Sequence, residues 1–434
     1  MKITIVGAGY VGLVSGVCFA EFGFNVTCVD NNKNKINELI AGNIPIYEPG
    51  LAEILKRNVQ AKRLKFSTKH NESIKKSDVV FIAVGTPSRR GDGHADLTYV
   101  FDVAKEISLS LEGYTVVVIK STVPVGTGRQ VKKIIQNTNS KARFDMVSNP
   151  EFLREGSAIN DFMHPDRIVV GFESKKSKEI MSSIYRPLYL LETPILFTDL
   201  ETSELIKYAS NAFLAMKISF INQMADLSEK VGANINDVSK GMGLDKRIGP
   251  KFLHPGPGFG GSCFPKDTEA LLKTSIDVSC SVSLVEETIN YNKKRKLLMA
   301  YKIIHFLNND IKNSTISILG LSFKPETDDF RESPAIDIIS ELIDHGAKIN
   351  AYDPQAIKEA KKILPSKVKY FLSAKECISN ADCVVIVTEW NEFRALSLYE
   401  TKESMKGDKL VDLRNIFSLE EANKAGLKYL SIGR

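Results

Sequence analysis

Residues 2–12 of the chain read KITIVGAGYVG. The apolar run before the first glycine predicts a short buried strand, and an apolar helix is expected to follow as far as about Glu21. The glycines have separate tasks: Gly7 permits a tight turn, Gly9 lets backbone amides reach a pyrophosphate, and Gly12 lets helix and strand pack closely. The stretch therefore predicts the start of a dinucleotide-binding βαβ unit.

The same unit continues with a second expected strand at residues 25–29, which ends at Asp30. A carboxylate at this distance from Gly12 can accept hydrogen bonds from both ribose hydroxyls of a dinucleotide, and it repels a 2′-phosphate. NAD is therefore predicted as the cofactor in preference to NADP.

Two further parallel strands are predicted at residues 78–84 and 115–119, where dense apolar runs end in loop residues. In open α/β sheets, ligands bind at the carboxyl ends of the strands. Thr86 and Thr122 follow these strands and are therefore candidates for the cofactor side of a site. The alternative is an ordinary turn or helix-cap role for both threonines.

Composition limits the classes of protein that the chain can represent. Its 434 residues are 43% hydrophobic and 25% charged, as in a globular protein with two or three domains. The six cysteines show no paired spacing and no C-x-x-C motif, so free thiols in a reducing cytosol are expected and no metal is predicted.

Charge and hydropathy argue against two other kinds of partner. The net charge of +6 is mild and the basic residues form no recurrent block, so a small anionic substrate is favoured over nucleic acid. Residues 3–20 are uncharged, but the four glycines among them suit a strand, turn and helix better than a membrane span.

Cys263 lies in a loop with the sequence PGFGGSCFPKD, residues 257–267. Glycines there allow close approach to a ligand, and a neighbouring lysine favours the thiolate, which is the nucleophilic form of cysteine. This cysteine is therefore predicted to be reactive. The other five suit the role of small buried hydrophobes, and they are Cys18, Cys28, Cys280, Cys377 and Cys383.

A helix without proline or glycine is predicted over residues 200–231. It is too long for an ordinary crossover helix and is expected to link two domains. Lys207 and Asn211 are four residues apart on it and project from one face. Spacing alone favours a solvated surface pair, but the apolar neighbours indicate a covered helix, and a covered lysine points to function.

The last third of the chain repeats the pattern of the first. Strands are predicted at 315–320, 346–353 and 381–387. The loop after the first of them lacks the second and third fingerprint glycines, while Lys324 and Arg331 supply side-chain charge. We infer a site for a different nucleotide-like anion. The alternative is a degenerate repeat that is kept only for packing.

The expected fold is therefore α/β, with two Rossmann-like parallel-sheet domains joined by a long central helix. Residues 1–199 are assigned to the NAD-binding domain, 200–308 to a central helical region that carries the cysteine loop, and 309–434 to the second Rossmann-like domain.

The chain is identified by its ordered motifs as a member of the UDP-glucose/GDP-mannose dehydrogenase family, of bacterial type. The resemblance runs from end to end and is nearer to the UDP-glucose branch. The motifs that carry it are GAGYVG at 7–12, VGTPS at 84–88, STVPVGT at 121–127, NPEFLREG at 149–156, KYASN at 207–211, GFGGSCFPKD at 258–267 and FKPETDDFRESP at 323–334.

The resemblance implies an NAD-dependent four-electron oxidation of UDP-glucose to UDP-glucuronate. In that chemistry Cys263 adds to the intermediate aldehyde and forms a thiohemiacetal, which can give up a second hydride and leave a thioester. Three alternatives stay open: the same reaction on GDP-mannose or UDP-N-acetylmannosamine, a two-electron hydroxyacid dehydrogenase, and a non-catalytic NAD-binding protein.

Catalytic roles carried over from the family fall on six residues. Lys207 is expected to stabilise the developing alkoxide with help from Asn211, while Asp267 manages protons near the thiol. Glu151 is the candidate base for thioester hydrolysis, and Thr122 would orient the water. Together with Cys263, these residues form the predicted catalytic set.

The resemblance also implies binding residues and a subunit arrangement. For NAD these are Gly7, Gly9, Val11, Gly12, Asp30, Lys35, Thr86, Thr122, Glu155, Lys266 and Arg331. For the nucleotide sugar they are Glu151, Phe152, Leu153, Arg154, Glu155, Lys207, Asn211, Arg247, Phe252, Leu253, His254, Pro255, Gly256, Gly260 and Lys324. A cytoplasmic homodimer through the central helix is expected, with Arg247 reaching a neighbouring subunit.

Overall fold

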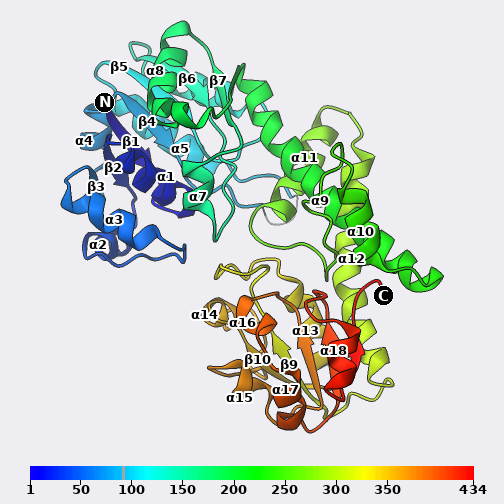
Figure 1. Cartoon of the computed structure of the whole chain (residues 1–434). Helices are drawn as coiled ribbons and strands as arrows, with labels where there is room; N and C mark the ends of the chain where they lie inside the picture. Colours follow the sequence, from blue (N-terminus) through cyan, green and yellow to red (C-terminus); the bar gives the residue numbers. More distant parts are fainter. Residues whose placement is uncertain (90–92) are drawn as a thin grey trace. The chain divides into compact units, whose positions relative to one another are not determined.

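The computed structural model describes residues 1–89 and 93–434. The chain divides into two compact units (Figure 1). The first unit comprises residues 1–210 with 273–280, and the second comprises residues 211–272 with 281–434.

The first unit is built on an eight-stranded sheet with the strand order β3-β2-β1-β4-β5-β6-β7-β8. All neighbouring strands are parallel except β6 and β7, which are antiparallel. The first six strands have the order 3-2-1-4-5-6 of a dinucleotide-binding fold. The strands are β1 Lys2–Val6, β2 Asn25–Val29, β3 Leu64–Ser67, β4 Val79–Ile82, β5 Tyr114–Ile119, β6 Arg143–Ser148, β7 Ile168–Phe172 and β8 Ile195–Thr198.

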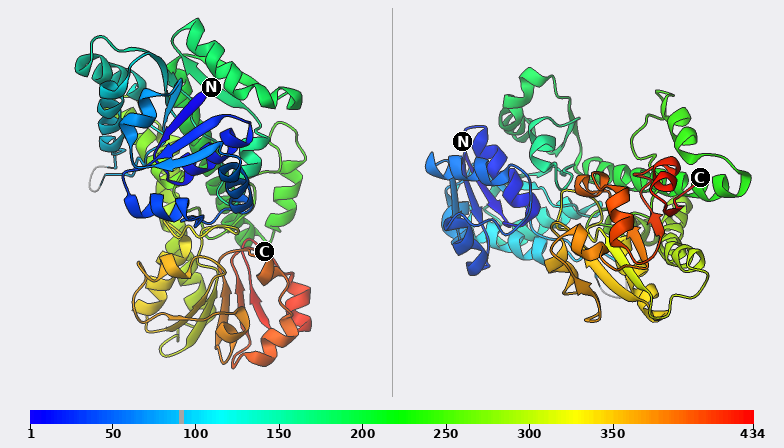
Figure 2. Two further views of the ribbon diagram at one scale, coloured as in Figure 1. Left: turned by 90° about the vertical axis from the view of Figure 1, so that its left-hand side faces the viewer. Right: turned by 60° about the horizontal axis from the view of Figure 1, so that its bottom comes forward.

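Both faces of this sheet are buried, which explains why its strands are apolar without alternation. In β4, Val79 and Phe81 belong to one hydrophobic core, and Val80 and Ile82 belong to the core on the opposite face. Helices supply the cover on each side (Figure 2). They are α1 Tyr10–Glu21, α2 Lys33–Ile40, α3 Leu51–Gln60, α4 His70–Lys75, α5 Thr98–Ser110, α6 Thr127–Thr138, α7 Ala158–Met163 and α8 Lys175–Tyr185, followed by the 3-10 helix Arg186–Leu191.

The second unit holds a six-stranded, fully parallel sheet with the order β11-β10-β9-β12-β13-β14. This order repeats the 3-2-1-4-5-6 arrangement of the first six strands of the other sheet. Residues of β12 again alternate between two cores, Cys383 on one face and Val384 on the other. The strands are β9 Thr315–Leu319, β10 Lys348–Tyr352, β11 Lys369–Tyr370, β12 Cys383–Ile386, β13 Lys409–Asp412 and β14 Lys428–Leu430.

The remaining helices begin with α9, Leu200–Val231, which has the bounds predicted from the sequence. Its first turns belong to the first unit and the rest to the second. The others are α10 Ile235–Gly243, α11 Phe264–Asp277, α12 Ser283–Phe306, α13 Pro334–Asp344, α14 Ile357–Ala360, α15 Ala374–Ile378, α16 Asn391–Arg394, α17 Leu398–Ser404 and α18 Leu419–Lys424.

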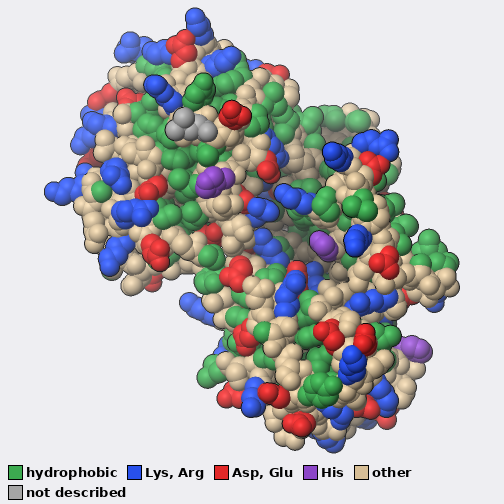
Figure 3. Space-filling model, viewed as in Figure 1, with side chains coloured by type: hydrophobic (Ala, Val, Ile, Leu, Met, Phe, Trp, Pro, Cys, Tyr) green, Lys and Arg blue, Asp and Glu red, His purple; other side chains and the backbone are tan. Residues whose placement is uncertain are grey.

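The predicted fold class is confirmed, with two Rossmann-like sheets and a long central helix. The strands expected at 2–6 and 25–29 form with those bounds, while the run 78–84 is shorter as β4. Within the described ranges, no helix has the length and apolar character needed to cross a bilayer. Basic and acidic side chains are interspersed over the visible face (Figure 3).

Candidate active site

The glycine loop after β1 has the geometry that a dinucleotide requires. Gly7 has a φ of +103°, and a Cβ there would lie 2.6 Å from the carbonyl oxygen of Ala83. A Cβ on Gly12 would lie 1.8 Å from the Gly7 oxygen, whereas a Cβ on Gly9 would meet nothing within 4 Å. The first and third glycines are therefore fixed by packing, and the second keeps the loop backbone open to a ligand.

Asp30 ends β2 beside this loop as a charged acceptor. Its Oδ2 accepts from the Ala8 N–H and from Lys35 Nζ, both at 2.9 Å, and its Oδ1 accepts from the Asn32 N–H at 2.9 Å. Burial alone would raise the pKa of Asp30, but these hydrogen bonds outweigh it and lower the pKa below the ordinary value. The loop and the ionised aspartate together fit NAD, with Lys35 held against the carboxylate.

The candidates on the neighbouring strand ends lie together, as predicted. Thr86 donates its hydroxyl to the carbonyl oxygen of Thr122 at 2.8 Å, which joins the loops after β4 and β5. Val11 lies in the first turn of α1. The loop that carries Glu155 is held by Glu48, which accepts from the Gly156 and Ala158 N–H groups at 2.7 Å each.

Lys207 and Glu151 form a buried ion pair in the first unit. Nζ of Lys207 lies 3.2 Å from Glu151 Oε1, and the two side chains are only 4% and 6% exposed. Glu151 also accepts from the Leu153 N–H, and the ring of Phe152 lies 5.3 Å from Lys207 Nζ. The sequence expectation of a covered lysine is confirmed, and the pair sets a cation beside a candidate base.

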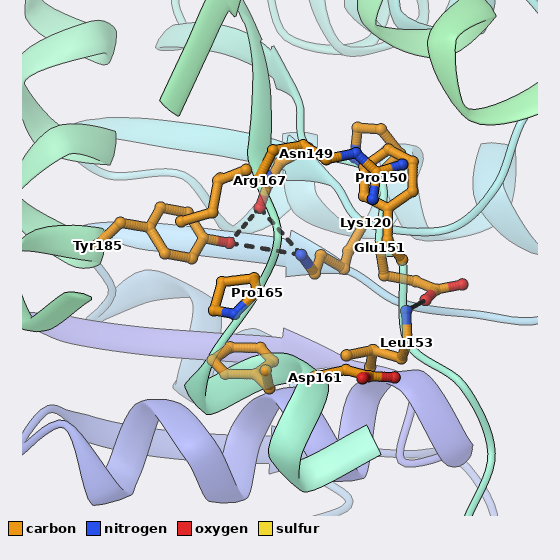
Figure 4. A pocket seen from close by; sticks show the side chains of 12 residues that line it. Lys120, Asn149, Pro150, Glu151, Leu153, Asp161, Pro165, Arg167 and Tyr185 are labelled. Carbon is orange, nitrogen blue, oxygen red and sulfur yellow. Dashed lines mark hydrogen bonds between the residues drawn. The ribbon is translucent and has the colours of Figure 1, made fainter. Parts of the chain in front are cut away.

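Lys120 is a functional candidate that sequence reasoning missed. It follows β5 directly and donates to Asn149 Oδ1 at 3.2 Å and to the Tyr185 hydroxyl at 3.4 Å (Figure 4). Burial lowers the pKa of Lys120, Glu151 opposes this shift and Lys207 adds to it, and the resulting pKa is about 8. The available signal was a lysine at the end of an uncharged buried strand.

A small cavity of about 40 Å³ lies beside these groups, large enough for a few ordered waters. Lys120 and Glu151 line it together with Phe152 (Figure 4 labels the first two). The guanidinium of Arg167 stacks over the Phe152 ring, 3.6 Å from the ring centroid. The cavity therefore connects the missed lysine to the candidate base. The side chain of Arg154 pairs with Asp161, which also lines the cavity.

Glu204, one turn before Lys207, holds the loop that carries Thr122. Its carboxylate accepts from the Gly126 N–H at 2.6 Å and from the Gly128 N–H at 2.8 Å, where α6 begins. Burial raises the pKa of Glu204 to about 7 even though both hydrogen bonds oppose the shift.

This raised pKa predicts a pH-dependent stability. The folded chain binds the Glu204 proton more tightly than the unfolded chain, so this contribution is complete below pH 4.5 and is lost as pH rises through 7. The expected loss in unfolding free energy is at most about 3 kcal/mol. Urea unfolding of Glu204→Gln from pH 5 to 8 should show a flatter profile than the parent. Glu201→Gln, on the same helix, is the control, and parallel profiles for Glu204→Gln and the parent would contradict the assignment.

Cys263 immediately precedes α11 in the second unit and is partly exposed. Its carbonyl oxygen accepts the Asp267 N–H at 2.8 Å, and its Sγ lies 3.6 Å from the Ser262 hydroxyl. The positive end of the helix dipole favours a thiolate at such a position. Among the other cysteines, Cys280 was wrongly expected to be buried: it is exposed in the connection between α11 and α12, where no core covers it.

Asp267 links the remaining catalytic candidates of the second unit. Its Oδ2 accepts from Asn211 Nδ2 and its Oδ1 from Lys266 Nζ, both at 2.6 Å. The carboxylate is almost fully buried, at 1% exposure. Both oxygens are therefore oriented, as a proton-handling group requires.

The charged residues of the loop 323–332 lie beside the residues that directly precede Cys263. Arg331 makes two hydrogen bonds to Asp329, at 2.7 and 3.0 Å, and Asp329 Oδ2 accepts the Ser262 N–H at 3.0 Å. Lys324 Nζ lies 5.5 Å from the Phe323 ring, and a Cβ on Gly261 would lie 2.7 Å from that ring. The predicted anion-binding residues therefore belong to a loop that contacts Gly261 and Ser262, next to Cys263.

The first loop of the second Rossmann-like sheet differs from that of the first sheet. Asp353 Oδ2 accepts from the Leu321 and Ser322 N–H groups at 2.7 and 2.9 Å, and from Trp390 Nε1 at 3.2 Å. The chain's own carboxylate thus takes the backbone donors that a pyrophosphate would use. A Cβ on Gly320 would also lie 2.4 Å from Thr388 Cβ.

Five of the predicted substrate residues, 252–256, form a loop that precedes the cysteine loop in sequence. Phe252 has a φ of +64°, its ring centroid lies 6.1 Å from that of Phe264, and Leu253 is buried in the core of the second unit. His254 is exposed. The side chain of Arg247 is 89% exposed and pairs with Asp245.

The predicted site residues thus form two groups, each assembled within one unit. The first unit brings together Asp30, Lys35, Thr86, Thr122, Glu151 and Lys207 by the strand ends of its sheet and the start of α9. The second unit brings together Asn211, Gly260, Cys263, Lys266, Asp267, Lys324 and Arg331.

Comparison with known proteins places family models along the chain. Three domains described for the UDP-glucose/GDP-mannose dehydrogenase family match it: the NAD binding domain over residues 1–189, the central domain over 201–294 and the UDP binding domain over 317–419.

The chain is also similar to individual proteins over its full length. It is 56% identical to a UDP-glucose 6-dehydrogenase of Rhizobium meliloti (strain 1021), with all of both chains covered. It is 49% identical to UDP-glucose 6-dehydrogenase TuaD of Bacillus subtilis (strain 168), covering all of this chain and 93% of that one. A solved UDP-glucose dehydrogenase from Pyrobaculum islandicum superposes with a TM-score of 0.91 at 35% identity, covering 99% of this chain and 96% of that one.

Proposed function

The chain belongs to the UDP-glucose/GDP-mannose dehydrogenase family, and from that premise we propose that it oxidises UDP-glucose to UDP-glucuronate with NAD. The observation that carries the proposal is the 56% identity over complete chains to a UDP-glucose 6-dehydrogenase. The buried Lys207–Glu151 pair and the partly exposed Cys263 before α11 supply the groups that such a reaction needs.

The first oxidation converts the C6 alcohol of the glucosyl group to an aldehyde. NAD, when bound, accepts one hydride in each of the two oxidations. The task of Lys207 is to stabilise the negative charge that develops on the C6 oxygen, with a hydrogen bond from Asn211. Asp267 handles the alcohol proton, supported by the orientation of both of its oxygens.

The second oxidation requires Cys263, because an aldehyde has no hydride to release until a group adds to its carbonyl carbon. The thiolate forms a C–S bond there, and the carbonyl oxygen takes a proton to give a thiohemiacetal. Loss of hydride from carbon and of the proton from oxygen leaves a thioester on Cys263.

Hydrolysis completes the reaction. Glu151 acts as the base that takes a proton from water, which Thr122 orients, and the hydroxyl oxygen attacks the thioester carbon. The C–S bond breaks, the sulfur leaves as thiolate, and the acid ionises to the carboxylate. The balance is one substrate, one water and two NAD consumed, with two NADH, one carboxylate and three protons formed.

The number of NADH released per UDP-glucose tests this proposal against its alternatives. Limiting UDP-glucose should yield two equivalents of NADH at 340 nm and UDP-glucuronate by chromatography. One equivalent would indicate a two-electron dehydrogenase, and none would indicate a non-catalytic NAD-binding protein. Parallel assays with GDP-mannose and UDP-N-acetylmannosamine distinguish the same chemistry on another nucleotide sugar.

The assembly and the roles of the segments belong to the same proposal. We assign NAD binding to residues 1–199, the cysteine loop and dimer contacts to 200–308, and UDP-sugar binding to 309–434.

A homodimer through α9 is supported by Phe213, Phe220 and Leu227, which are 58%, 44% and 53% exposed and seven residues apart. Sedimentation of a Phe220→Glu variant as a monomer, against a dimeric parent, tests this contact.

A cytoplasmic location is proposed on the same basis. All six cysteines are free thiols, and four of them are buried in the cores of the two units. Such thiols suit a reducing compartment.

A further inference from the structure

The thiol loop, defined as residues 256–261, is held by its backbone. Four of its six residues are glycine, so side chains contribute little to fixing it, yet all six residues are buried. A buried backbone needs partners for its N–H and C=O groups. The residues that supply them therefore determine where the loop, and Cys263 two residues beyond it, can lie.

Asn292 of α12 hydrogen-bonds both backbone groups of one loop residue, Phe259. Its Oδ1 accepts the Phe259 N–H at 2.8 Å, and its Nδ2 donates to the Phe259 carbonyl oxygen at 3.0 Å. This is the pairing that a neighbouring strand would offer, supplied by one side chain. A Cβ on Gly258 would lie 2.9 Å from the same Oδ1, so the loop approaches Asn292 closely.

Arg295 lies one turn further along α12 and is fully buried. Its Nε donates to the Gly256 carbonyl oxygen at 3.1 Å, and its Nη1 binds Asp226 of α9. The Gly256 N–H is bound in turn by Asn222 Oδ1 of α9 at 2.8 Å. Burying a guanidinium is costly unless it is paired and hydrogen-bonded. The pair with Asp226 offsets part of this cost, and the bond to Gly256 fixes the start of the loop.

Lys296 contacts both the thiol loop and Glu332, the residue that follows Arg331. Its Nζ donates to the Glu332 carbonyl oxygen at 2.9 Å, and its Cγ lies 3.3 Å from the position of a Cβ on Gly258. A Cβ on Gly260 would lie 2.2 Å from the same Glu332 oxygen. Lys296 thus contacts the thiol loop and the backbone of Glu332, which packs against that loop at Gly260.

We propose that Asn292, Arg295 and Lys296 are positioning residues that align the Cys263 sulfur with the C6 aldehyde. Their spacing places them on one face of α12, which acts as a rigid backing for the thiol loop. None of the three takes part in bond making, so their effect is expected on the second oxidation. This inference rests on the proposed function, because it assigns the alignment to a covalent step.

Asn292→Asp is the sharpest test, since it keeps the shape and replaces the Nδ2 donor with an oxygen that repels the Phe259 carbonyl. Oxidation of the C6 aldehyde form of UDP-glucose should fall roughly tenfold or more, because small misplacements of reacting groups are costly. The KM for NAD should stay within about twofold, since the loop after β1 is unaffected. Amide hydrogen exchange over residues 256–263 should become faster than in the parent.

Lys294→Ala is the matched control, because Lys294 is exposed on the same helix. It should leave both aldehyde oxidation and hydrogen exchange unchanged. Lys296→Met is the second variant in case Asn292→Asp does not fold: it keeps the methylene stem and removes Nζ together with its contacts to Glu332 and Asp337. It should slow aldehyde oxidation and speed loop exchange in the same direction.

The outcomes separate this inference from the proposed function. Two NADH per UDP-glucose from the parent, together with loss of aldehyde oxidation in Cys263→Ser, would uphold the covalent mechanism. If the mechanism holds and folded Asn292→Asp oxidises the aldehyde at the parent rate, the positioning role is wrong. If the parent releases one NADH, the proposed function fails first, whatever the loop variants do.

Discussion

Cys263→Ser is expected to oxidise the C6 aldehyde at least ~10³-fold more slowly than the parent, because a serine hydroxyl is a far weaker nucleophile than a thiolate. The first oxidation does not need the sulfur, so NADH per UDP-glucose should drop from two to at most one. Binding of UDP-glucose and NAD should persist, since serine keeps nearly the size and shape of cysteine. Single-turnover absorbance at 340 nm and equilibrium titration measure these quantities.

Cys280→Ser is the matched control for this prediction. Cys280 is also outside any disulfide, and it is exposed in the connection between α11 and α12. Its substitution should leave the NADH yield at two. A Cys263→Ser enzyme that still turned over at the parent rate would overturn the covalent mechanism and leave a direct hydration route for the aldehyde.

Lys207→Met is expected to lower kcat by about 10²–10³-fold, the loss that follows removal of one stabilising donor from a developing oxyanion. The substitution also removes the cation paired with Glu151, whose carboxylate is 6% exposed. Breaking a buried ion pair from one side costs about 3–5 kcal/mol. Both kcat, from steady-state kinetics, and the free energy of unfolding, from urea unfolding of the same samples, should therefore fall.

Lys207→Arg separates these two effects. It keeps a cation near Glu151 and should recover most of the stability, but its planar guanidinium cannot replace an ammonium that points at one oxygen. Its kcat should stay well below that of the parent. Lys230→Met, an exposed lysine in the last turn of α9, should change neither quantity. Recovery of full kcat in Lys207→Arg would show that Lys207 acts only through its charge.

Much of the fold could be predicted because it depends on short-range patterns. The apolar runs around 2–6 and 25–29 form β1 and β2 with the expected bounds, since buried parallel strands need continuous apolar sequence. The helix 200–231 was correct at both ends for a similar reason: no proline or glycine interrupts it. The run 78–84 was too long because apolar residues continue past the last strand pairing, into the loop after β4.

The candidate site was predictable where glycines or motif residues lie close together in sequence. Gly7, Gly12 and Asp30 belong to one local unit, and their conformations and hydrogen bonds follow from it. Lys120 was missed because its one local signal, a position directly after the apolar strand β5, does not reveal that it lies beside Glu151. Cys280 was misplaced for the converse reason, because residue type alone does not reveal whether a core covers a turn.

The sequence by itself therefore determined the two Rossmann-like repeats, the dinucleotide loop and the long helix. Each of these depends on the period of apolar residues or on glycines within a few positions of one another. Only the tertiary structure decided which charges meet. Lys207 and Glu151 are 56 residues apart, as are Asn211 and Asp267, and Asn292 lies 33 residues from Phe259. Such partners are brought together by the packing of strands and helices, which residue order along the chain does not specify.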